Sequence, residues 1–212
     1  SFTNGGFDIA IGNPPYVEVD SKKYEKVIGK ISQTKNLYSY MINNYFNYTK
    51  EDAKISVIVL MSLIASQKMK YLRQKLMNIK GNIYFMNIDS ATYPGRLFKG
   101  LMIRLTILTV ARNINQGNHV FSTNYMRFYH NERKNLFKDV YYGEVDLCKT
   151  INKKYLFIPK LGSVQAVSIL KKIYKKTNIT FEKYIKKEKG CNSIYYRNTE
   201  AVYYCKIGRA SC

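Results

Sequence analysis

Apolar positions divide the first 112 residues into short continuous runs and helical stripes. Residues 7–13 (FDIAIGN) and 54–66 (KISVIVLMSLIAS) are almost continuously apolar, which is typical of strands covered on both faces of a parallel sheet. Residues 81–89 and 101–112 predict two more strands. Residues 36–49 and 67–78 repeat apolar residues at helical spacing and predict two helices, the first capped by Asn36. The order strand, helix, strand, helix, strand, strand predicts an α/β layer architecture.

The pattern changes after residue 115. Residues 116–150 are polar and aromatic with weak periodicity, whereas residues 163–176 (SVQAVSILKKIYKK) predict a helix with lysines outside its apolar stripe: Lys171, Lys172, Lys175 and Lys176. From residue 149 to residue 189 there are twelve lysines and two glutamates. We therefore predict three parts: a catalytic part over 1–115, a basic helical linker over 116–190, and the start of another domain over 191–212.

Positive charge dominates the composition. The 212 residues contain 35 Lys and Arg against 14 Asp and Glu, for a formal net charge of +21 and a pI near 9.7. Such a field favours a polyanionic partner, most simply nucleic acid. The alternative is compositional, because an AT-rich genome encodes the Lys, Asn, Ile and Tyr that are abundant here. The helix lysines are candidates for contacts with DNA, although a solvated helix face would show the same pattern.

Other classes of protein find little support in the sequence. Its cysteines, Cys148, Cys191, Cys205 and Cys212, form no CxxC pair, and His119 and His130 stand at no metal-like spacing, so we expect no metal site. No apolar run has the length of a membrane span, and residues 1–8 do not resemble a signal peptide. We expect a cytoplasmic protein with no membrane partner.

The first predicted strand ends in Asn13-Pro14-Pro15-Tyr16, which suits chemistry on an amino group attached to a planar ring. The lone pair of such an amine is delocalised, so it is a poor nucleophile. Hydrogen bonds from the two amine hydrogens to the Asn13 side-chain oxygen and the Pro14 carbonyl would localise the lone pair for attack. Two prolines make the loop rigid, and the Tyr16 ring could stack on the base. In an open α/β sheet a site is expected at this carboxyl end of a strand.

The stretch GGFDIAIGNPPYV resembles the catalytic motif of adenine-N6 DNA methyltransferases of restriction–modification systems, especially large type IIG-like chains that combine methylation and cleavage. NLYSYMINNYF, YPGRLFKGLMIRLTILTVAR, IPKLGS and IYYRNTEAVYY resemble later segments of that family, up to the start of its target-recognition domain. The resemblance implies a Rossmann-like class I methyltransferase sheet, of which this chain carries the C-terminal half, followed by a basic linker and the start of a target-recognition domain.

The resemblance also assigns roles to residues. Asn13, Pro14, Pro15 and Tyr16 would be catalytic, and Tyr16 would stack on an adenine flipped out of duplex DNA. An aromatic residue of the later loop would cover the other face of the base, with Phe98 as the first candidate and Tyr93 as the second; core packing is the alternative for Phe98. The implied methyl donor is S-adenosylmethionine, with Asn13 at the cofactor and the remaining contacts upstream of Ser1.

The sequence departs from this family in three places. The glycine-rich cofactor motif and the acidic ribose-binding residue would precede residue 1, so we expect a missing N-terminal half of the same polypeptide. Residues 51–66 lack the glycine before, and the proline after, the second strand, and the final GRASC matches nothing in the family. Two other functions stay open: methylation of protein glutamine or ribosomal RNA, which can use the same motif, and a non-catalytic DNA-binding remnant.

Overall fold

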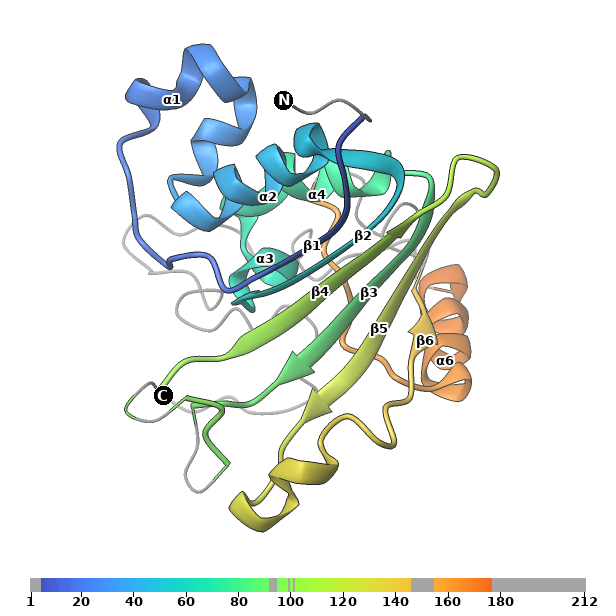
Figure 1. Ribbon diagram of the computed structural model, residues 1–212. Helices are drawn as coiled ribbons and strands as arrows, with labels where there is room; N and C mark the ends of the chain where they lie inside the picture. The colour runs from blue at the N-terminus through green and yellow to red at the C-terminus, as the bar shows by residue number, and fades with distance from the viewer. Residues whose placement is uncertain (1–4, 92–94, 99, 101, 146–154, 177–212) are drawn as a thin grey trace, which may run out of the picture.

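The strands come together in one mixed six-stranded sheet with the order β1-β2-β4-β3-β5-β6 (Figure 1). This computed structural model describes residues 5–91, 95–98, 100, 102–145 and 155–176. The strands are β1 (Phe7–Gly12), β2 (Thr49–Leu60), β3 (Gly81–Ile88), β4 (Leu105–Arg112), β5 (Asn118–Met126) and β6 (Gly143–Glu144). The α-helices are α1 (Ser21–Ile28), α2 (Leu37–Tyr48), α3 (Ser62–Ala65), α4 (Lys70–Met77) and α6 (Val164–Lys176), and the 3-10 helices are η1 (Gly29–Thr34), η2 (Gln67–Met69) and η3 (His130–Asn135).

Four strands of the sheet run in the same direction. β1 is parallel to β2 and β3 is parallel to β5, while β4 lies antiparallel between β2 and β3. The carboxyl ends of β1, β2, β3 and β5 therefore meet at one edge of the sheet, and the loop after each strand begins there. We call this the carboxyl edge. Ligands of open α/β sheets bind at such an edge, so the fold brings the residue 13–16 loop to the expected place.

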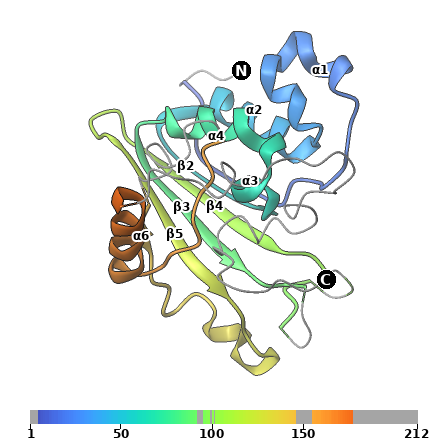
Figure 2. The same ribbon diagram turned by 180° about the vertical axis from the view of Figure 1, so that it is seen from behind.

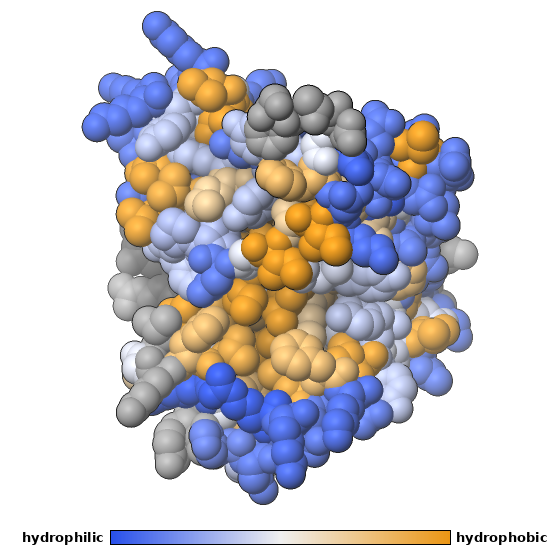
Figure 3. All heavy atoms as spheres, viewed as in Figure 1, coloured by the Kyte–Doolittle hydropathy of each residue, from blue (hydrophilic) through white to orange (hydrophobic). Residues whose placement is uncertain are grey.

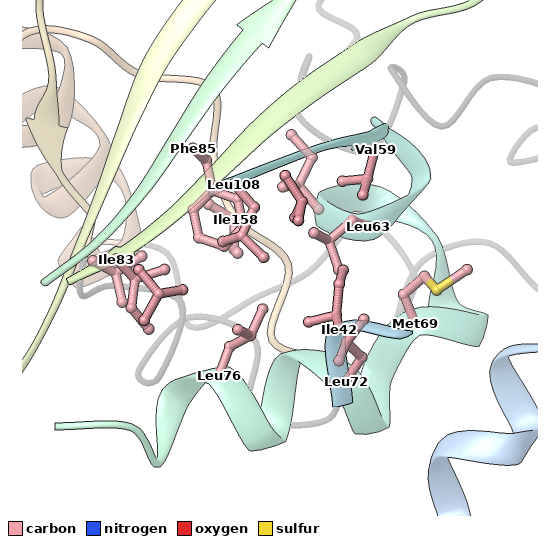
Figure 4. Close-up of a cluster of buried hydrophobic side chains, with 14 of the residues drawn as sticks. Ile42, Val59, Leu63, Met69, Leu72, Leu76, Ile83, Phe85, Leu108 and Ile158 are labelled. Atoms are coloured by element: carbon pink, nitrogen blue, oxygen red, sulfur yellow. The ribbon is translucent and has the colours of Figure 1, made fainter. Parts of the chain in front are cut away.

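Helices cover one face of the sheet. Figure 2 shows α3, α4 and the segment 155–162 in front of the strands, and Figure 4 shows Ile42, Leu63, Leu72 and Leu76 directed toward side chains of the strands, among them Phe85 and Leu108. These residues are fully buried in one apolar cluster. At about 25 cal/mol per Å² of apolar surface removed from water, each such side chain contributes roughly 2 kcal/mol. The stripe predicted on residues 36–49 is thus the core face of α2, and Asn36 does cap that helix by accepting from Tyr38 N at 3.2 Å.

The opposite face of the sheet is open. In the part of the chain that the structure describes, no helix crosses the face seen in Figure 1, and Figure 3 shows apolar side chains gathered over it. β1 pairs with β2 at one end of the sheet, and its Phe7, Ile9 and Ile11 are 54%, 60% and 80% exposed. The prediction of a buried strand over 7–13 is therefore wrong, because β1 lies at the end of the described sheet and pairs there only with β2.

Several elements differ from the sequence-based prediction. Helix α1 lies between residues 13 and 36, where the sequence predicted no helix or strand, and it buries no residue. Residues 62–65 continue the apolar run of β2 but form α3, since a fully apolar run does not distinguish strand from helix. Residues 118–126 form β5, which alternates buried and exposed positions only in part and has a bulge against β3. The sheet thus runs across residue 115, the boundary expected from composition.

Candidate active site at the carboxyl edge

The Asn13-Pro14-Pro15-Tyr16 loop follows β1 directly at the carboxyl edge. Asn13 and Pro15 are exposed, Pro14 is buried and Tyr16 is half-buried. Downstream, the loop is tied to the start of α2, where Leu37 N donates to Val17 O at 2.9 Å. The rigid prolines and this backbone bond hold the loop from both sides. The Asn13 amide therefore stands in solvent on a loop whose course is fixed.

Tyr16 connects this loop to the neighbouring strand. Its hydroxyl lies 2.7 Å from Asn13 Oδ1 and 3.1 Å from the carbonyl oxygen of Ile58 in β2, and it is the donor in both contacts. A phenol has one proton, so the two acceptors compete for it. The shorter contact, to Asn13 Oδ1, is the stronger hydrogen bond. An amide oxygen has two lone pairs, so Asn13 Oδ1 retains one with which to accept a hydrogen from a substrate amine.

Burial keeps the Tyr16 hydroxyl protonated. Removal of the ring from water raises the pKa of Tyr16 to about 12. The ring meets Tyr38 edge to face, with ring centroids 6.4 Å apart. Tyr38 is fully buried and its hydroxyl lies 3.1 Å from Ser62 Oγ, just beyond β2. At neutral pH Tyr16 is therefore a fixed hydrogen-bond donor that orients Asn13.

The loop after β3 carries Phe98, the first candidate for the second stacking ring. Leu97 N donates to Ser90 Oγ at 2.6 Å, and Arg133 donates to Leu97 O at 2.9 Å, so the loop is held beside η3. Phe98 is half-buried, and both it and Tyr16 pack against one buried cluster: Met86, Ile88, Leu97, Leu105, Phe128 and Leu136. The Phe98 and Tyr16 rings thus pack against the same buried cluster. The stacking role of Phe98 stays a prediction. Tyr93, the second candidate, lies outside the described residues.

Gly95 allows this loop to reach its position. A Cβ added at residue 95 would stand 1.7 Å from the backbone oxygen of Phe128, closer than any real Cβ contact. The loop and the chain after β5 therefore touch backbone to backbone at this point. The sequence signal for this contact is the glycine of the Pro-Gly pair at 94–95.

The predicted DNA-contacting lysines lie elsewhere in the fold. Lys171 and Lys172 are exposed on α6, which also contains Lys175 and Lys176. Helix α6 packs beside β6, at the opposite end of the strand order from β1. With six strands spaced by about 4.8 Å, roughly 24 Å of sheet separates the two end strands. The structure does not bring these lysines to the Asn13 loop, and their role stays a prediction.

A buried arginine that the sequence did not point to lies behind the sheet. Arg73 of α4 is fully buried and donates to Leu63 O at 2.6 Å and to Tyr155 O at 3.0 and 2.7 Å. Ile158 N also donates to Ile64 O at 3.1 Å. These bonds fasten the segment 155–162, which we call the crossing segment, over the helices behind β2. A lone arginine in an amphipathic pattern gave no signal, because its partners are backbone oxygens far away in the sequence.

Other kinds of site find no support among the described residues. They contain no group of three His, Cys, Asp or Glu side chains that could hold a metal ion, and no helix long and apolar enough to cross a membrane. All four cysteines lie outside them. A cavity of about 400 Å³ lies at the amino ends of the strands, lined by Lys75, Lys80, Arg112 and neighbours, on the edge opposite Asn13.

The strand order and directions are those of a Rossmann-like class I methyltransferase sheet, as the sequence predicted. One solved structure with a similar fold is a nuclease-deletion mutant of the type ISP restriction–modification enzyme LlaGI in complex with a DNA substrate mimic. Its TM-score against this chain is 0.52, at 16% sequence identity. The match covers 65% of this chain and 17% of that one.

Residues 1–92 match the family model described as Eco57I restriction-modification methylase. Weaker structural matches include a DrdV–DNA complex, with a TM-score of 0.48, 16% identity and coverage of 64% of this chain and 17% of that one. A modification subunit of a putative type I restriction enzyme from Vibrio vulnificus YJ016 has a TM-score of 0.48 at 10% identity, covering 78% and 39% of the two chains. No curated protein sequence matches the chain. The chain spans about a sixth of the first two structural relatives.

Proposed function

We propose that this chain carries the catalytic loop of a restriction–modification DNA methyltransferase that methylates N6 of an adenine flipped out of duplex DNA. The observation that carries the proposal is the Asn13 amide, exposed at the carboxyl edge and oriented by the Tyr16 hydroxyl at 2.7 Å. The match of residues 1–92 to a restriction–modification methylase family supports the methyltransferase class. The net charge of +21 supports DNA as the substrate.

In this proposal the chain's own groups activate the amine. Asn13 Oδ1 and the Pro14 carbonyl accept the two N6 hydrogens, which localises the nitrogen lone pair and aims it at the electrophile. Tyr16 holds the amide and offers its ring to one face of the base, and Phe98 covers the other. Flipping costs a few kcal/mol, and stacking on two rings returns about as much. The implied donor, S-adenosylmethionine, supplies an electrophilic methyl group when bound.

The fit of that donor to this chain is partial. Asn13 is exposed just after β1, an end strand of the described sheet, and we expect its amide to contact a donor bound beside this strand. We propose that the other contacts come from an upstream half of the polypeptide, whose strand pairs with β1 and covers exposed Phe7, Ile9 and Ile11.

Substitution of Asn13 tests the assignment in the enzyme completed by that upstream half. Asn13→Ala should lower the methylation rate by about a hundredfold, corresponding to roughly 3 kcal/mol of lost transition-state stabilisation, while DNA affinity stays near that of the wild type. Asn47→Ala, at an exposed asparagine of α2, is the matched control. The readout is N6-methyladenine in unmethylated genomic DNA, quantified by mass spectrometry of nucleosides. Wild-type turnover of Asn13→Ala, or methylation of glutamine peptide or ribosomal RNA instead, would overturn the proposal.

A further inference from the structure

Three cations gather around one tyrosine at the carboxyl edge. Arg104, just before β4, donates from Nε to the Tyr125 hydroxyl at 2.9 Å, and Lys160 Nζ lies 5.1 Å from the centre of the Tyr125 ring. Arg127 follows the last residue of β5 and lies beside the cluster through its contact with Asp89. Its Nε lies 2.8 Å from Oδ2 of Asp89, and the Arg127 side chain is 71% exposed. We call these four residues with Asp89 the Tyr125 cluster.

Three of the five side chains in the cluster are cationic: Arg104, Arg127 and Lys160. Asp89 is buried and pairs with Arg127. Burial raises the pKa of Tyr125, and the neighbouring Asp89 raises it further, so the phenol stays neutral. Arg104 is exposed and Lys160 is half-buried. One neutral ring therefore orients two cations from different parts of the chain, through its hydroxyl and through its face.

The chain supports this arrangement from behind. Lys160 belongs to the crossing segment, which Arg73 fastens through its bonds to Tyr155 O. The segment is also bonded to β5, since Gly162 N donates to Asn124 Oδ1 at 2.9 Å. Lys160 is thus held between the helices behind β2 and the end of β5. Fixed cations lose less entropy on binding an anion than lysines on a free helix face.

Met61 relates the cluster to the candidate active site. Met61 N donates to Arg104 O at 3.0 Å, and Met61 Sδ lies 3.9 Å from Lys160 Nζ. Tyr16 contacts β2 at Ile58 O, three residues before Met61, which directly follows that strand. Three residues of extended chain span roughly 10 Å. At about 3.4 Å of rise per nucleotide, that corresponds to about three nucleotides of one DNA strand.

We propose that Arg104 and Lys160, with Arg127 beside them, bind the phosphates of the DNA strand next to the target adenine. The inference rests on the proposed function and adds the residues that hold the substrate backbone. Phosphate contacts fix the register of a protein on duplex DNA without reading its sequence. They would hold the backbone while the base leaves the stack. The Tyr125 cluster thus takes the role that the sequence alone had suggested for the lysines of α6.

DNA binding by the enzyme completed by its upstream half, measured without S-adenosylmethionine, tests this assignment without any need for catalysis. The probe is a fluorescein-labelled 30-base-pair duplex, titrated by anisotropy at several salt concentrations. The double variant Arg104→Gln/Lys160→Gln should bind about tenfold more weakly at 0.1 M salt. It should also reduce the slope of log affinity against log salt by about 2, since each phosphate contact contributes about 0.9. Lys171→Gln/Lys172→Gln removes the same charge from α6 and should change the slope by less than half as much.

A third variant separates binding from folding. Tyr125→Phe keeps the ring under Lys160 but removes the hydroxyl that orients Arg104, so it should weaken binding by about threefold with an unchanged slope. Thermal unfolding followed by circular dichroism shows that each variant is folded. An unchanged slope in a folded Arg104→Gln/Lys160→Gln protein, a larger effect in the α6 variant, or stronger binding of duplex RNA would overturn the inference. Failure of the proposed function would show instead as absent N6-methyladenine with the charge effect intact.

Discussion

The Tyr16 hydroxyl donates to Asn13 Oδ1 at 2.7 Å, so the ring and the amide of the candidate site form one connected unit. The same hydroxyl lies 3.1 Å from Ile58 O, which fixes that unit to β2. The ring proposed to stack on the base is therefore also the group that sets the direction of the amide. Loss of the hydroxyl and loss of the ring should have different consequences.

Tyr16→Phe should lower the methylation rate by about fivefold in the enzyme completed by its upstream half. The variant keeps the ring but loses a hydrogen bond with a net value of about 1 kcal/mol. Tyr16→Ala also loses stacking, a further cost of about 1–3 kcal/mol, and should be slower again by about tenfold or more. Single-turnover methylation measures both rates. Tyr141→Phe, at a tyrosine 76% exposed, is the control. Equal rates for Tyr16→Phe and Tyr16→Ala would show that the ring does not contact the base.

The stability of the chain should fall in alkaline solution, in part because of Tyr16. Burial raises the pKa of Tyr16 to about 12, whereas an unfolded tyrosine has a pKa of about 10. The unfolded chain therefore loses this proton first as the pH rises. The contribution to stability is fully present below pH 10 and is lost as the pH rises through 12. Urea unfolding should show a smaller loss between pH 8 and pH 11 for Tyr16→Phe than for the wild type. Equal losses would mean that Tyr16 is not protected in the folded chain.

Phe98→Ala should weaken trapping of the flipped base. Phe98 shares an apolar cluster with Tyr16, and removal of the ring would leave one face of the adenine uncovered. With 2-aminopurine at the target position, the fluorescence increase on binding should be reduced, while duplex affinity changes little. Phe137→Ala, at a phenylalanine 63% exposed near η3, is the matched control. A normal increase for Phe98→Ala would transfer the role to Tyr93.

The 212-residue chain by itself should bind S-adenosylmethionine no better than background and should aggregate. Exposed Phe7, Ile9 and Ile11 lie on β1, an end strand of the described sheet, and an apolar end strand tends to pair with another chain. Addition of the upstream half, fused or as a separate chain, should restore both solubility and cofactor binding. Ile9→Lys/Ile11→Lys should improve solubility without restoring binding. Isothermal titration calorimetry measures the affinity. Tight binding by the chain alone would place the cofactor site elsewhere.

The sequence by itself determined the α/β class, the helix α2 with its Asn36 cap, and the end of β1 as the place of the candidate site. These features are local: an apolar run, a helical stripe and a capping side chain depend on neighbours in the chain. The chemical role proposed for Asn13-Pro14-Pro15-Tyr16 is also a local inference, because the four residues are contiguous, and it stays a prediction.

Only the tertiary structure decided which distant residues meet. It placed β4 antiparallel between β2 and β3, added β5 to the sheet, and left β1 exposed at one end. It also joined Arg104, Tyr125 and Lys160, which come from three separate segments, while α6 went to the far end of the sheet. Charge counted along the chain pointed to the lysine-rich helix. The charge near the site depends on the strand order and on the course of the crossing segment. Long-range hydrogen bonds, such as the one from Arg73 to Tyr155 O, determine that course.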